Sequence, residues 1–281
     1  MNISQILLEA ANLLADSGIP DSRAEASSLL VHTLGREPIF LVAHPEYDLT
    51  DNEEKTFREL LRRRAGREPF HYIVGHKEFF GLDFEVSPDV LIPRPETEIL
   101  VEEAIQLLRE RDKPSFCDIG VGTGCISISI LHNVENAIAV GVDISEKALT
   151  IAWRNAAKLT VADRLTLHEA DVFDGITGKF DLIVSNPPYI PTEDIPELQR
   201  EVRDHEPHTA LHGGAVGLDL IERVICESPE HLTPQGVLLM EIGFGQSGKV
   251  HELFDLSIWL LPEFLLDLQG IPRIVKAQTL L

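Results

Sequence analysis

Basic residues are scarce in this chain of 281 residues: 24 Lys and Arg stand against 46 Asp and Glu, and the formal net charge is −22. Proteins that bind nucleic acid usually carry a basic face, because neutralising phosphates supplies most of their affinity. The charge therefore weighs against DNA as a partner and favours a small molecule or a basic protein. An acidic surface that only keeps the protein in solution is the alternative interpretation.

Long hydrophobic runs are also missing. No stretch reaches the roughly 18 apolar residues of a membrane-spanning helix, and the N-terminus lacks the basic and apolar segments of a secretory signal. The three cysteines, Cys117, Cys125 and Cys226, have neither zinc-ligand spacing nor an even count, so we expect reduced core thiols. These features predict a cytoplasmic protein without a membrane partner or a metal site, and we expect a monomer.

Residues 1–75 carry the apolar spacing of a small helical bundle, the first expected domain. The first helix is expected to stop near Gly18, and a second is expected over residues 21–34. A third begins at the capping box that Thr50 forms with Glu53.

Four arginines near the end of this domain form its one basic cluster: Arg62, Arg63, Arg64 and Arg67. Clusters of this kind are usually solvated helix faces, which is the expectation here. A binding role for the cluster is the alternative.

A β-hairpin is expected next, because residues 78–86 alternate in polarity around Gly81. We expect residues 76–95 to form a hairpin linker between domains. At its end Pro93 and Pro95 hold the backbone extended just before another helix.

Residues 96–281 are expected to form an α/β domain, because strand-like and helix-like segments alternate along them. Such alternation is typical of a mainly parallel sheet with helices on both faces, here a Rossmann-like sheet of seven strands. The expected strands cover residues 116–119, 137–142, 165–168, 180–184, 237–242, 257–261 and 271–277.

The turn after the first of these strands is rich in glycine. Gly120, Gly122 and Gly124 alternate there with Val121 and Thr123. Glycines at alternate positions let the backbone turn tightly and approach a ligand closely. Because a purely structural turn would look the same, this signal is weak when it stands alone.

The ends of the next two strands strengthen it. Asp143 could accept hydrogen bonds from both ribose hydroxyls of a nucleoside, while Asp171 could accept from an adenine amino group with Val172 packed on the ring. The glycine spacing differs from that of pyrophosphate-binding turns, and no basic residue lies in the turn. A cationic nucleoside without phosphate, such as S-adenosyl-L-methionine, therefore fits this site better than NAD.

The fourth strand leads into the segment Asn186, Pro187, Pro188 and Tyr189. The carboxyl ends of parallel strands form the ligand crevice, so this loop is expected beside the cofactor. The side-chain oxygen of Asn186 and the main-chain carbonyl of Pro187 can accept from the two hydrogens of one NH2 group, and Tyr189 offers a flat face for a planar amide or base. Two such acceptors stabilise positive charge as the nitrogen attacks a sulfonium methyl, and they also aim it. An ordinary proline turn is the alternative interpretation.

Taken together, these motifs resemble the HemK-type protein-(glutamine-N5) methyltransferases that modify peptide-chain release factors. The resemblance covers nearly the whole chain. It rests on residues 92–98, 118–125, 142–145, 148–149, 185–190, 210–214, 217–218 and 241–243.

The resemblance implies that the helical domain recognises the protein substrate and that the second domain transfers the methyl group. The substrate would be the glutamine of a Gly-Gly-Gln loop in a release factor. The cofactor would be converted to S-adenosyl-L-homocysteine. Asn186 would meet both cofactor and substrate, and Arg94 and Glu96 would line the substrate entrance, with a structural ion pair as the alternative for these two. The chain departs from the family pattern at Val216 and at residues 271–272, away from the proposed chemistry.

Three other functions stay open on sequence grounds. The same chemistry could act on a glutamine of a ribosomal protein or on an amino group of nucleic acid. A cofactor-binding scaffold without turnover is the third, although it would have no chemical need for both Asn186 and Tyr189.

Overall fold

The computed structural model describes residues 1–280 of the 281, and these residues form two compact units. The first unit contains Met1–Gly75 together with the short segment Gln199–His205, and the second contains His76–Leu198 and Glu206–Leu281. Nothing in the sequence pattern indicated that residues 199–205 would pack with the N-terminal helices.

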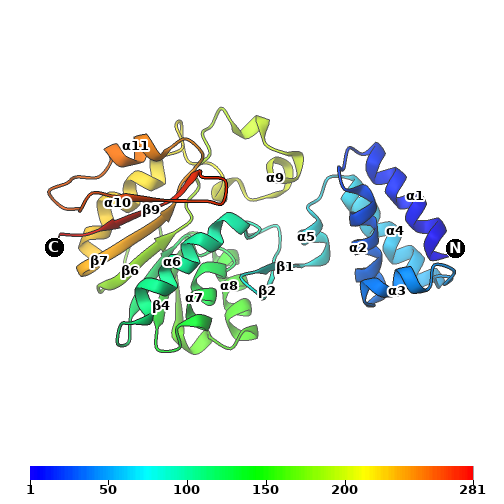
Figure 1. The fold of residues 1–281 in the computed structure, drawn as a ribbon, viewed down its shortest axis with the longest axis horizontal. Helices are drawn as coiled ribbons and strands as arrows, with labels where there is room; N and C mark the ends of the chain where they lie inside the picture. Colours follow the sequence, from blue (N-terminus) through cyan, green and yellow to red (C-terminus); the bar gives the residue numbers. More distant parts are fainter. Residues whose placement is uncertain (281) are drawn as a thin grey trace. The chain divides into compact units, whose positions relative to one another are not determined.

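The first unit is built from helices, as expected. Its core gathers the apolar faces of the helices around Phe57, Leu14 and Leu29, all fully buried. The capping box of Thr50 and Glu53 is present, and the second helix ends at Gly35 in the left-handed conformation. The helices are α1 (Ile3–Asp16), α2 (Ser22–Leu34), α3 (Pro38–Ala43), α4 (Asp51–Ala65), α5 (Phe70–Val74) and α9 (Arg200–His205) (Figure 1).

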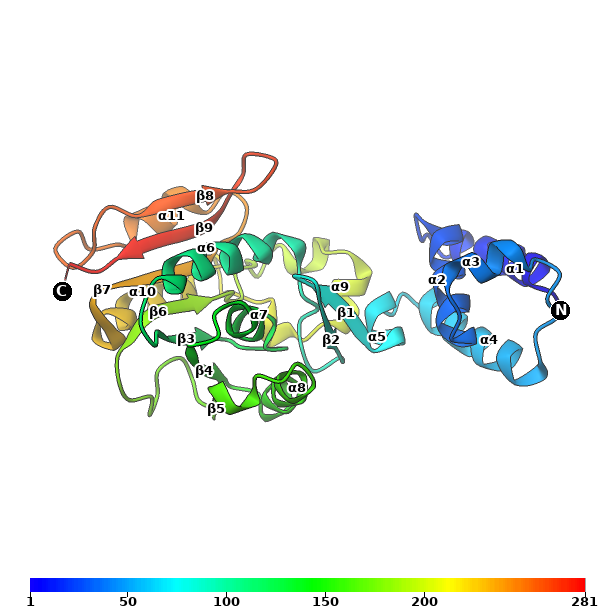
Figure 2. The same ribbon diagram turned by 60° about the horizontal axis from the view of Figure 1, so that its bottom comes forward.

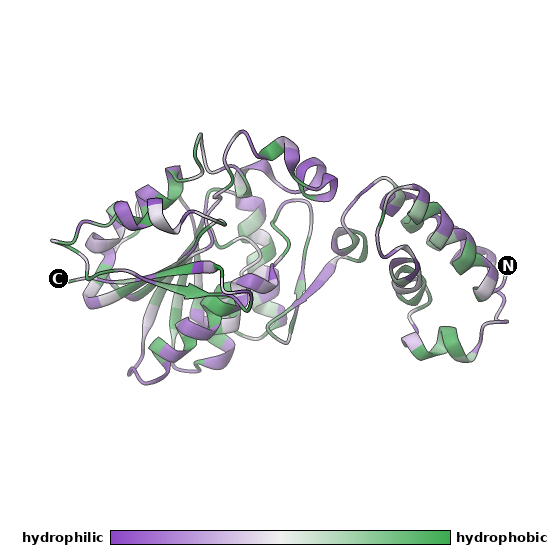
Figure 3. Cartoon of the chain, turned by 45° about the horizontal axis from the view of Figure 1, so that its top comes forward, coloured by the Kyte–Doolittle hydropathy of each residue, from purple (hydrophilic) through white to green (hydrophobic). Residues whose placement is uncertain are grey.

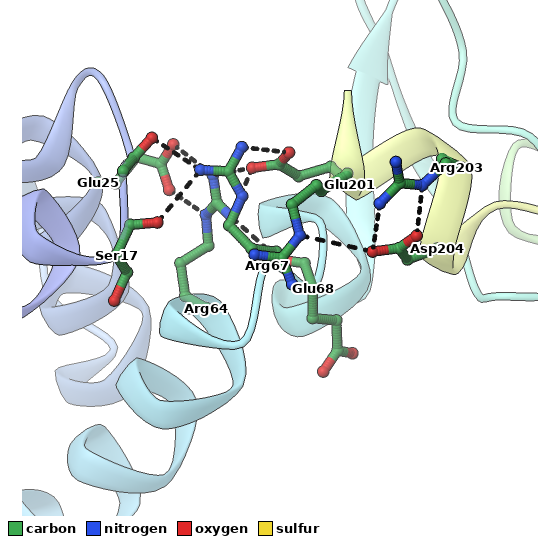
Figure 4. Close-up of polar contacts among 10 residues, drawn as sticks. Ser17, Glu25, Arg64, Arg67, Glu68, Glu201, Arg203 and Asp204 are labelled. Carbon is green, nitrogen blue, oxygen red and sulfur yellow. Dashed lines mark hydrogen bonds and ion pairs between the residues drawn. The ribbon is translucent and has the colours of Figure 1, made fainter. Parts of the chain in front are cut away.

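The arginine cluster of this unit is not a solvated helix face throughout, which corrects the sequence-based expectation. Arg64 is only 4% exposed, and its guanidinium bonds Glu25 and Glu201 (Figure 4). Arg67 donates to the other oxygen of Glu201 at 2.8 Å. A buried guanidinium needs carboxylate partners, so these arginines fasten α9 to the N-terminal helices.

The second unit is organised around a sheet of seven strands in the order β5-β4-β3-β6-β7-β9-β8. The first five strands in that order are parallel, and β9 runs antiparallel to both neighbours. The strands are β3 (Ser115–Ile119), β4 (Ile138–Asp143), β5 (Leu165–Glu169), β6 (Phe180–Ser185), β7 (Leu232–Glu241), β8 (Glu263–Leu266) and β9 (Pro272–Gln278). A separate hairpin, β1 (His76–Phe79) and β2 (Leu82–Glu85), turns at Gly81 as expected.

Helices cover both faces of this sheet, which confirms the predicted α/β class (Figure 2). Alternate strand residues face α6 (Glu98–Arg109), α7 (Cys125–Asn133) and α8 (Glu146–Lys158) on one side. Their neighbours face α10 (Asp219–His231) and α11 (Ser247–Glu252) on the other. The central strands are accordingly hydrophobic along most of their length (Figure 3).

One expected strand is misplaced. Residues 257–261 do not form a strand: residues 257–258 belong to a turn, in which the carboxylate of Asp255 accepts from the Ser257 N–H at 2.8 Å and its carbonyl accepts from Trp259. Trp259 forms only an isolated antiparallel bridge with Thr279. Pro262 follows, and the strand at this edge of the sheet is Glu263–Leu266. The apolar residues that suggested the strand serve the core through Trp259, which is 2% exposed.

Cys117 is buried and Cys125 partly buried, whereas Cys226 is exposed, so the expectation of a core position is wrong for Cys226. All three are free thiols. Within residues 1–280, no helix is long and apolar enough to cross a membrane.

Candidate active site

The glycine-rich turn joins β3 to α7 at the carboxyl edge of the sheet. Gly120, Gly122 and Gly124 all have positive φ angles, of 78°, 53° and 79°. At Gly124 a side chain would also collide with Ile128, because an added Cβ would lie 2.8 Å from its Cδ1. This is why the turn needs glycine, both for its backbone and for the close packing of α7.

The carboxylate of Asp143, at the end of β4, is held by two backbone N–H groups. Its Oδ2 accepts from Gly122 at 2.9 Å and its Oδ1 from Ser145 at 3.0 Å. Burial raises the pKa of Asp143, and these backbone hydrogen bonds oppose that rise. Asp143 therefore fixes the glycine turn, and each of its oxygens keeps a further lone pair for a ligand hydroxyl.

The end of β5 presents Asp171 and Val172. Both oxygens of Asp171 accept from Nη1 of Arg223 at 2.9 Å, a partner that the sequence did not reveal. Val172 is buried and has a φ of 57°, which is a rare conformation for a β-branched residue. Such backbone strain persists where the surroundings impose it, often at ligand sites.

These strand ends open on a cavity of about 280 Å3. Most of the predicted cofactor residues line it: Gly120, Val121, Gly122, Thr123, Asp143, Asp171, Val172 and Asn186. Gly124, the last glycine of the turn, is buried where α7 begins and is not part of the lining. The size suits a small ligand held mainly by apolar walls with a few polar groups.

The charge of the lining selects among ligands. The acidic side chains are Asp89, Asp143 and Asp171, whereas Arg94 is the one basic side chain among the described residues that line the cavity. Arg94 is paired with the buried carboxylate of Glu206 at 2.6 Å, just as Asp171 is paired with Arg223 and Asp89 with Lys147. Because the one basic side chain of this lining is already paired, the cavity fits a nucleoside without phosphate groups better than a dinucleotide.

The loop of residues 186–189 packs tightly against Gln246 and against the segment of residues 213–217. The side chain of Gln246 donates to the main-chain oxygens of Tyr189 at 2.9 Å and of Gly217 at 3.2 Å. An added Cβ on Gly217 would lie 2.2 Å from the oxygen of Tyr189, and one on Gly213 would lie 2.6 Å from that of Pro188. The chain that returns through residues 213–217 thereby fixes the course of the loop.

Two members of this loop are linked to one buried carboxylate, Tyr189 directly and Asn186 through Thr97. Glu241 ends β7, is 2% exposed, and accepts from the Tyr189 hydroxyl at 3.1 Å and from the Thr97 hydroxyl at 2.6 Å. Asn186 donates from Nδ2 to Thr97 Oγ1 at 3.1 Å. Burial raises the pKa of Glu241, the two hydroxyl donors lower it, and the charge of Glu96 raises it. Sequence reasoning gave Thr97 and Glu241 no role, because the partners lie far apart in the chain.

The remaining predicted substrate residues fall into two groups. Arg94, Asn186 and Pro188 line the cavity. Pro187, which is buried, and Tyr189, which bonds Glu241, are not part of the described lining. Glu96 is exposed and lies outside the described lining, and it is not the ion-pair partner of Arg94. Of the two departures from the family pattern, Val216 is exposed and Pro272 begins β9.

Comparison with known proteins gives the class of this chain and then its family. The family model described as "Methyltransferase small domain" matches residues 96–200, and "PrmC N-terminal domain" matches residues 5–75. A methyltransferase from Pyrococcus furiosus shares the fold, with a TM-score of 0.55 over 78% of this chain and 98% of that one, at 18% identity. The fold is thus that of a methyltransferase.

Two relatives narrow the class. A release factor glutamine methyltransferase from Koribacter versatilis is 39% identical over 98% of each chain. Another from Geobacter sulfurreducens is 41% identical over 97% of this chain and 95% of its own length. The chain belongs to the release factor glutamine methyltransferase family.

Proposed function

We propose that this protein transfers a methyl group from S-adenosyl-L-methionine to the side-chain N5 of the glutamine in the Gly-Gly-Gln loop of peptide-chain release factors. The observation that carries the proposal is the position of Asn186, which lines the same cavity as Asp143 and the glycine turn at the carboxyl edge of the sheet. The relatives named for this activity match almost the full length of the chain, which supports the same substrate class.

The cofactor site is formed by the glycine turn and the two following strand ends. Asp143 would accept hydrogen bonds from the ribose hydroxyls, Asp171 from the adenine amino group, and Val172 would pack on the ring. Residues 120–123 would lie along the rest of the cofactor, and Gly124 would shape the turn without lining the cavity. When bound, S-adenosyl-L-methionine supplies an electrophilic methyl group on a sulfonium, and S-adenosyl-L-homocysteine is the product.

The loop of residues 186–189 would hold the glutamine amide. Asn186 Oδ1 and the carbonyl of Pro187 accept from its two N–H groups, and the Tyr189 ring supports its plane while Pro188 closes the contact. The amide nitrogen is a poor nucleophile, because its lone pair is delocalised. Two acceptors on its hydrogens favour the positive charge that grows as it attacks, and they fix its direction.

The rest of the chain would select the protein substrate. We assign recognition of the release factor to residues 1–75, a linker role to residues 76–95, and catalysis to residues 96–281. Arg94, which Glu206 holds at the cavity, would line the substrate entrance, with Glu96 further out. The proposal includes a cytoplasmic monomer with no DNA or membrane partner and no metal.

Incubation with methyl-labelled S-adenosyl-L-methionine tests this function directly. A release factor, a preparation of ribosomal proteins and DNA are offered separately, and wild-type protein is compared with Asn186→Ala. We expect label on the release factor alone, and far less with the variant. Label on DNA or on ribosomal proteins only would overturn the proposed substrate.

A further inference from the structure

The side-chain amide of Asn186 could point either its oxygen or its nitrogen toward the cavity, and only one choice serves the chemistry. An acceptor must face the glutamine N–H groups, so Oδ1 must be free and Nδ2 must find a partner elsewhere. That partner is Thr97 Oγ1, at 3.1 Å.

Thr97 is ready to accept because its own hydroxyl hydrogen is already engaged. It donates to Glu241 Oε2 at 2.6 Å, within a region where Thr97 is 1% exposed and Glu241 2%. With the hydrogen directed at Glu241, the oxygen of Thr97 offers lone pairs alone, so the group opposite it must be a donor. The carboxylate thus determines, through Thr97, which end of the Asn186 amide turns away.

The same carboxylate reaches the other end of the loop. Glu241 Oε1 accepts from the hydroxyl of Tyr189 at 3.1 Å, so one side chain fixes both residues that would hold the substrate amide. The sheet places it there: Ser185, the last residue of β6, lies opposite Met240 of β7. Asn186 directly follows Ser185, and Glu241 follows Met240 as the last residue of β7.

We propose that Glu241 and Thr97 are positioning residues that orient Asn186 with its oxygen toward the substrate and hold the ring of Tyr189. The inference rests on the proposed function of residues 186–189. Neither residue touches the glutamine in this account; both act through the side chains that do.

Thr97→Val removes the hydroxyl at nearly constant volume and is the central variant. We expect kcat for a release factor to fall by about 10–100-fold, because the Asn186 amide loses the partner that selects its orientation. Affinity for S-adenosyl-L-homocysteine, measured by calorimetry, should stay within about threefold of wild type, since the glycine turn, Asp143 and Asp171 are unchanged. Thr97→Ser keeps the hydroxyl and should restore most of kcat.

The matched control is Thr279→Val, the same substitution at a position that is 2% exposed and belongs to the far end of the sheet. It should lower the melting temperature without changing kcat. Glu241→Gln provides a second test should Thr97→Val fold poorly. Its NH2 group deprives either Thr97 or Tyr189 of an acceptor, so kcat should again fall while S-adenosyl-L-homocysteine still binds.

The double variant Asn186→Ala/Thr97→Val separates this inference from the proposed function. If Thr97 acts through Asn186, the kcat of the double variant should be no lower than that of Asn186→Ala alone. An inactive Asn186→Ala beside a fully active Thr97→Val would overturn the inference and leave the function intact. A Thr97→Ser as slow as Thr97→Val would also overturn it. Wild-type turnover by Asn186→Ala would contradict both the proposed role of residues 186–189 in holding the substrate amide and this inference.

Discussion

Gln246 donates from Nε2 to the main-chain oxygen of Tyr189 at 2.9 Å, while its Oε1 accepts from the N–H of Gly243 at 2.7 Å. One buried amide thereby joins the proposed substrate loop to the segment after β7. An amide is required because the two sides of the contact need opposite hydrogen-bonding roles.

Gln246→Glu should therefore disrupt the loop. The new carboxylate oxygen would face the carbonyls of Tyr189 and Gly217, which can only accept, and the unmade bonds should cost about 1–3 kcal/mol. We expect a lower melting temperature and slower methyl transfer. Gln278→Glu is the matched control, because its Nε2 bonds a carbonyl at 3.1 Å in an exposed setting. If the two variants behave alike, the packing of the loop does not depend on Gln246.

Substitutions at Asn186 and Asp143 should separate catalysis from cofactor binding. Asn186→Ala should lower methyl transfer by about 10²–10³-fold with little loss of cofactor affinity, by analogy with the loss of one oxyanion donor. Asp143→Ala should weaken S-adenosyl-L-methionine binding, since it removes the ribose acceptor and loosens Gly122. Calorimetric titration of both variants measures the contrast. Undiminished affinity in Asp143→Ala would refute the ribose assignment.

The close approach of Gly217 to the loop of residues 186–189 can be tested by comparison with Gly175, a glycine of nearly the same φ angle. Gly217 has a φ of 77° and Gly175 a φ of 74°, but an added Cβ meets nothing within 4 Å at Gly175. Gly175→Ala should cost about 1–2 kcal/mol from the left-handed conformation alone. Gly217→Ala adds a collision with Tyr189 and should cost more and also slow turnover. Thermal denaturation measures the difference, and equal losses would contradict the close packing.

Asp118 predicts a pH dependence of stability. Burial raises the pKa of its carboxyl to about 7, the hydrogen bonds from Ser127 lower it, and the charge of Asp143 raises it. Because the folded-state pKa lies above the unfolded value, the protonated carboxyl stabilises the fold at low pH. This contribution is lost as the pH rises through about 7.

Asp118→Asn should remove that part of the dependence. Between pH 4 and pH 8 wild type should lose on the order of 1–3 kcal/mol more stability than the variant. Melting temperatures across this range provide the comparison. Parallel curves for the two proteins would show that Asp118 does not titrate as its burial implies.

The contact between Arg64 and Glu201 predicts where the helical unit can open locally. Glu201→Ala leaves Arg64 with the carboxylate of Glu25 and the main-chain oxygen of Glu68, and deprives Arg67 of a carboxylate. Amide hydrogen exchange in residues 199–205 should speed up by about 10–100-fold. Glu197→Ala, an exposed carboxylate just before this segment, should leave the exchange unchanged. Equal protection in both variants would mean that the ion pairs do not hold α9.

A structural feature can be predicted from the sequence when the residues that cause it lie close together in the chain. The capping box at Thr50 and the glycine turn at Gly120 could be predicted, because each arises within a few residues of chain. The misplaced strand at residues 257–261 shows the limit: Asp255 binds the local backbone in a turn despite favourable apolar residues.

Contacts between distant segments could not be predicted from the sequence. Thr97 and Glu241 are 144 positions apart, and Arg64 and Glu201 are 137 apart. Both pairs depend on how the elements pack, and the sequence around one partner does not indicate the other. The site residues that lie at strand ends were predictable, whereas the groups that orient them were not.

Peptide mapping by mass spectrometry tests the central claim most directly. A release factor is incubated with the protein and S-adenosyl-L-methionine, digested, and examined for the position of the added methyl group. The account predicts one methyl group on the side-chain nitrogen of the glutamine in the Gly-Gly-Gln loop, and none when that glutamine is replaced. A methyl group on any other residue, or an unmodified loop after full cofactor turnover, would contradict it.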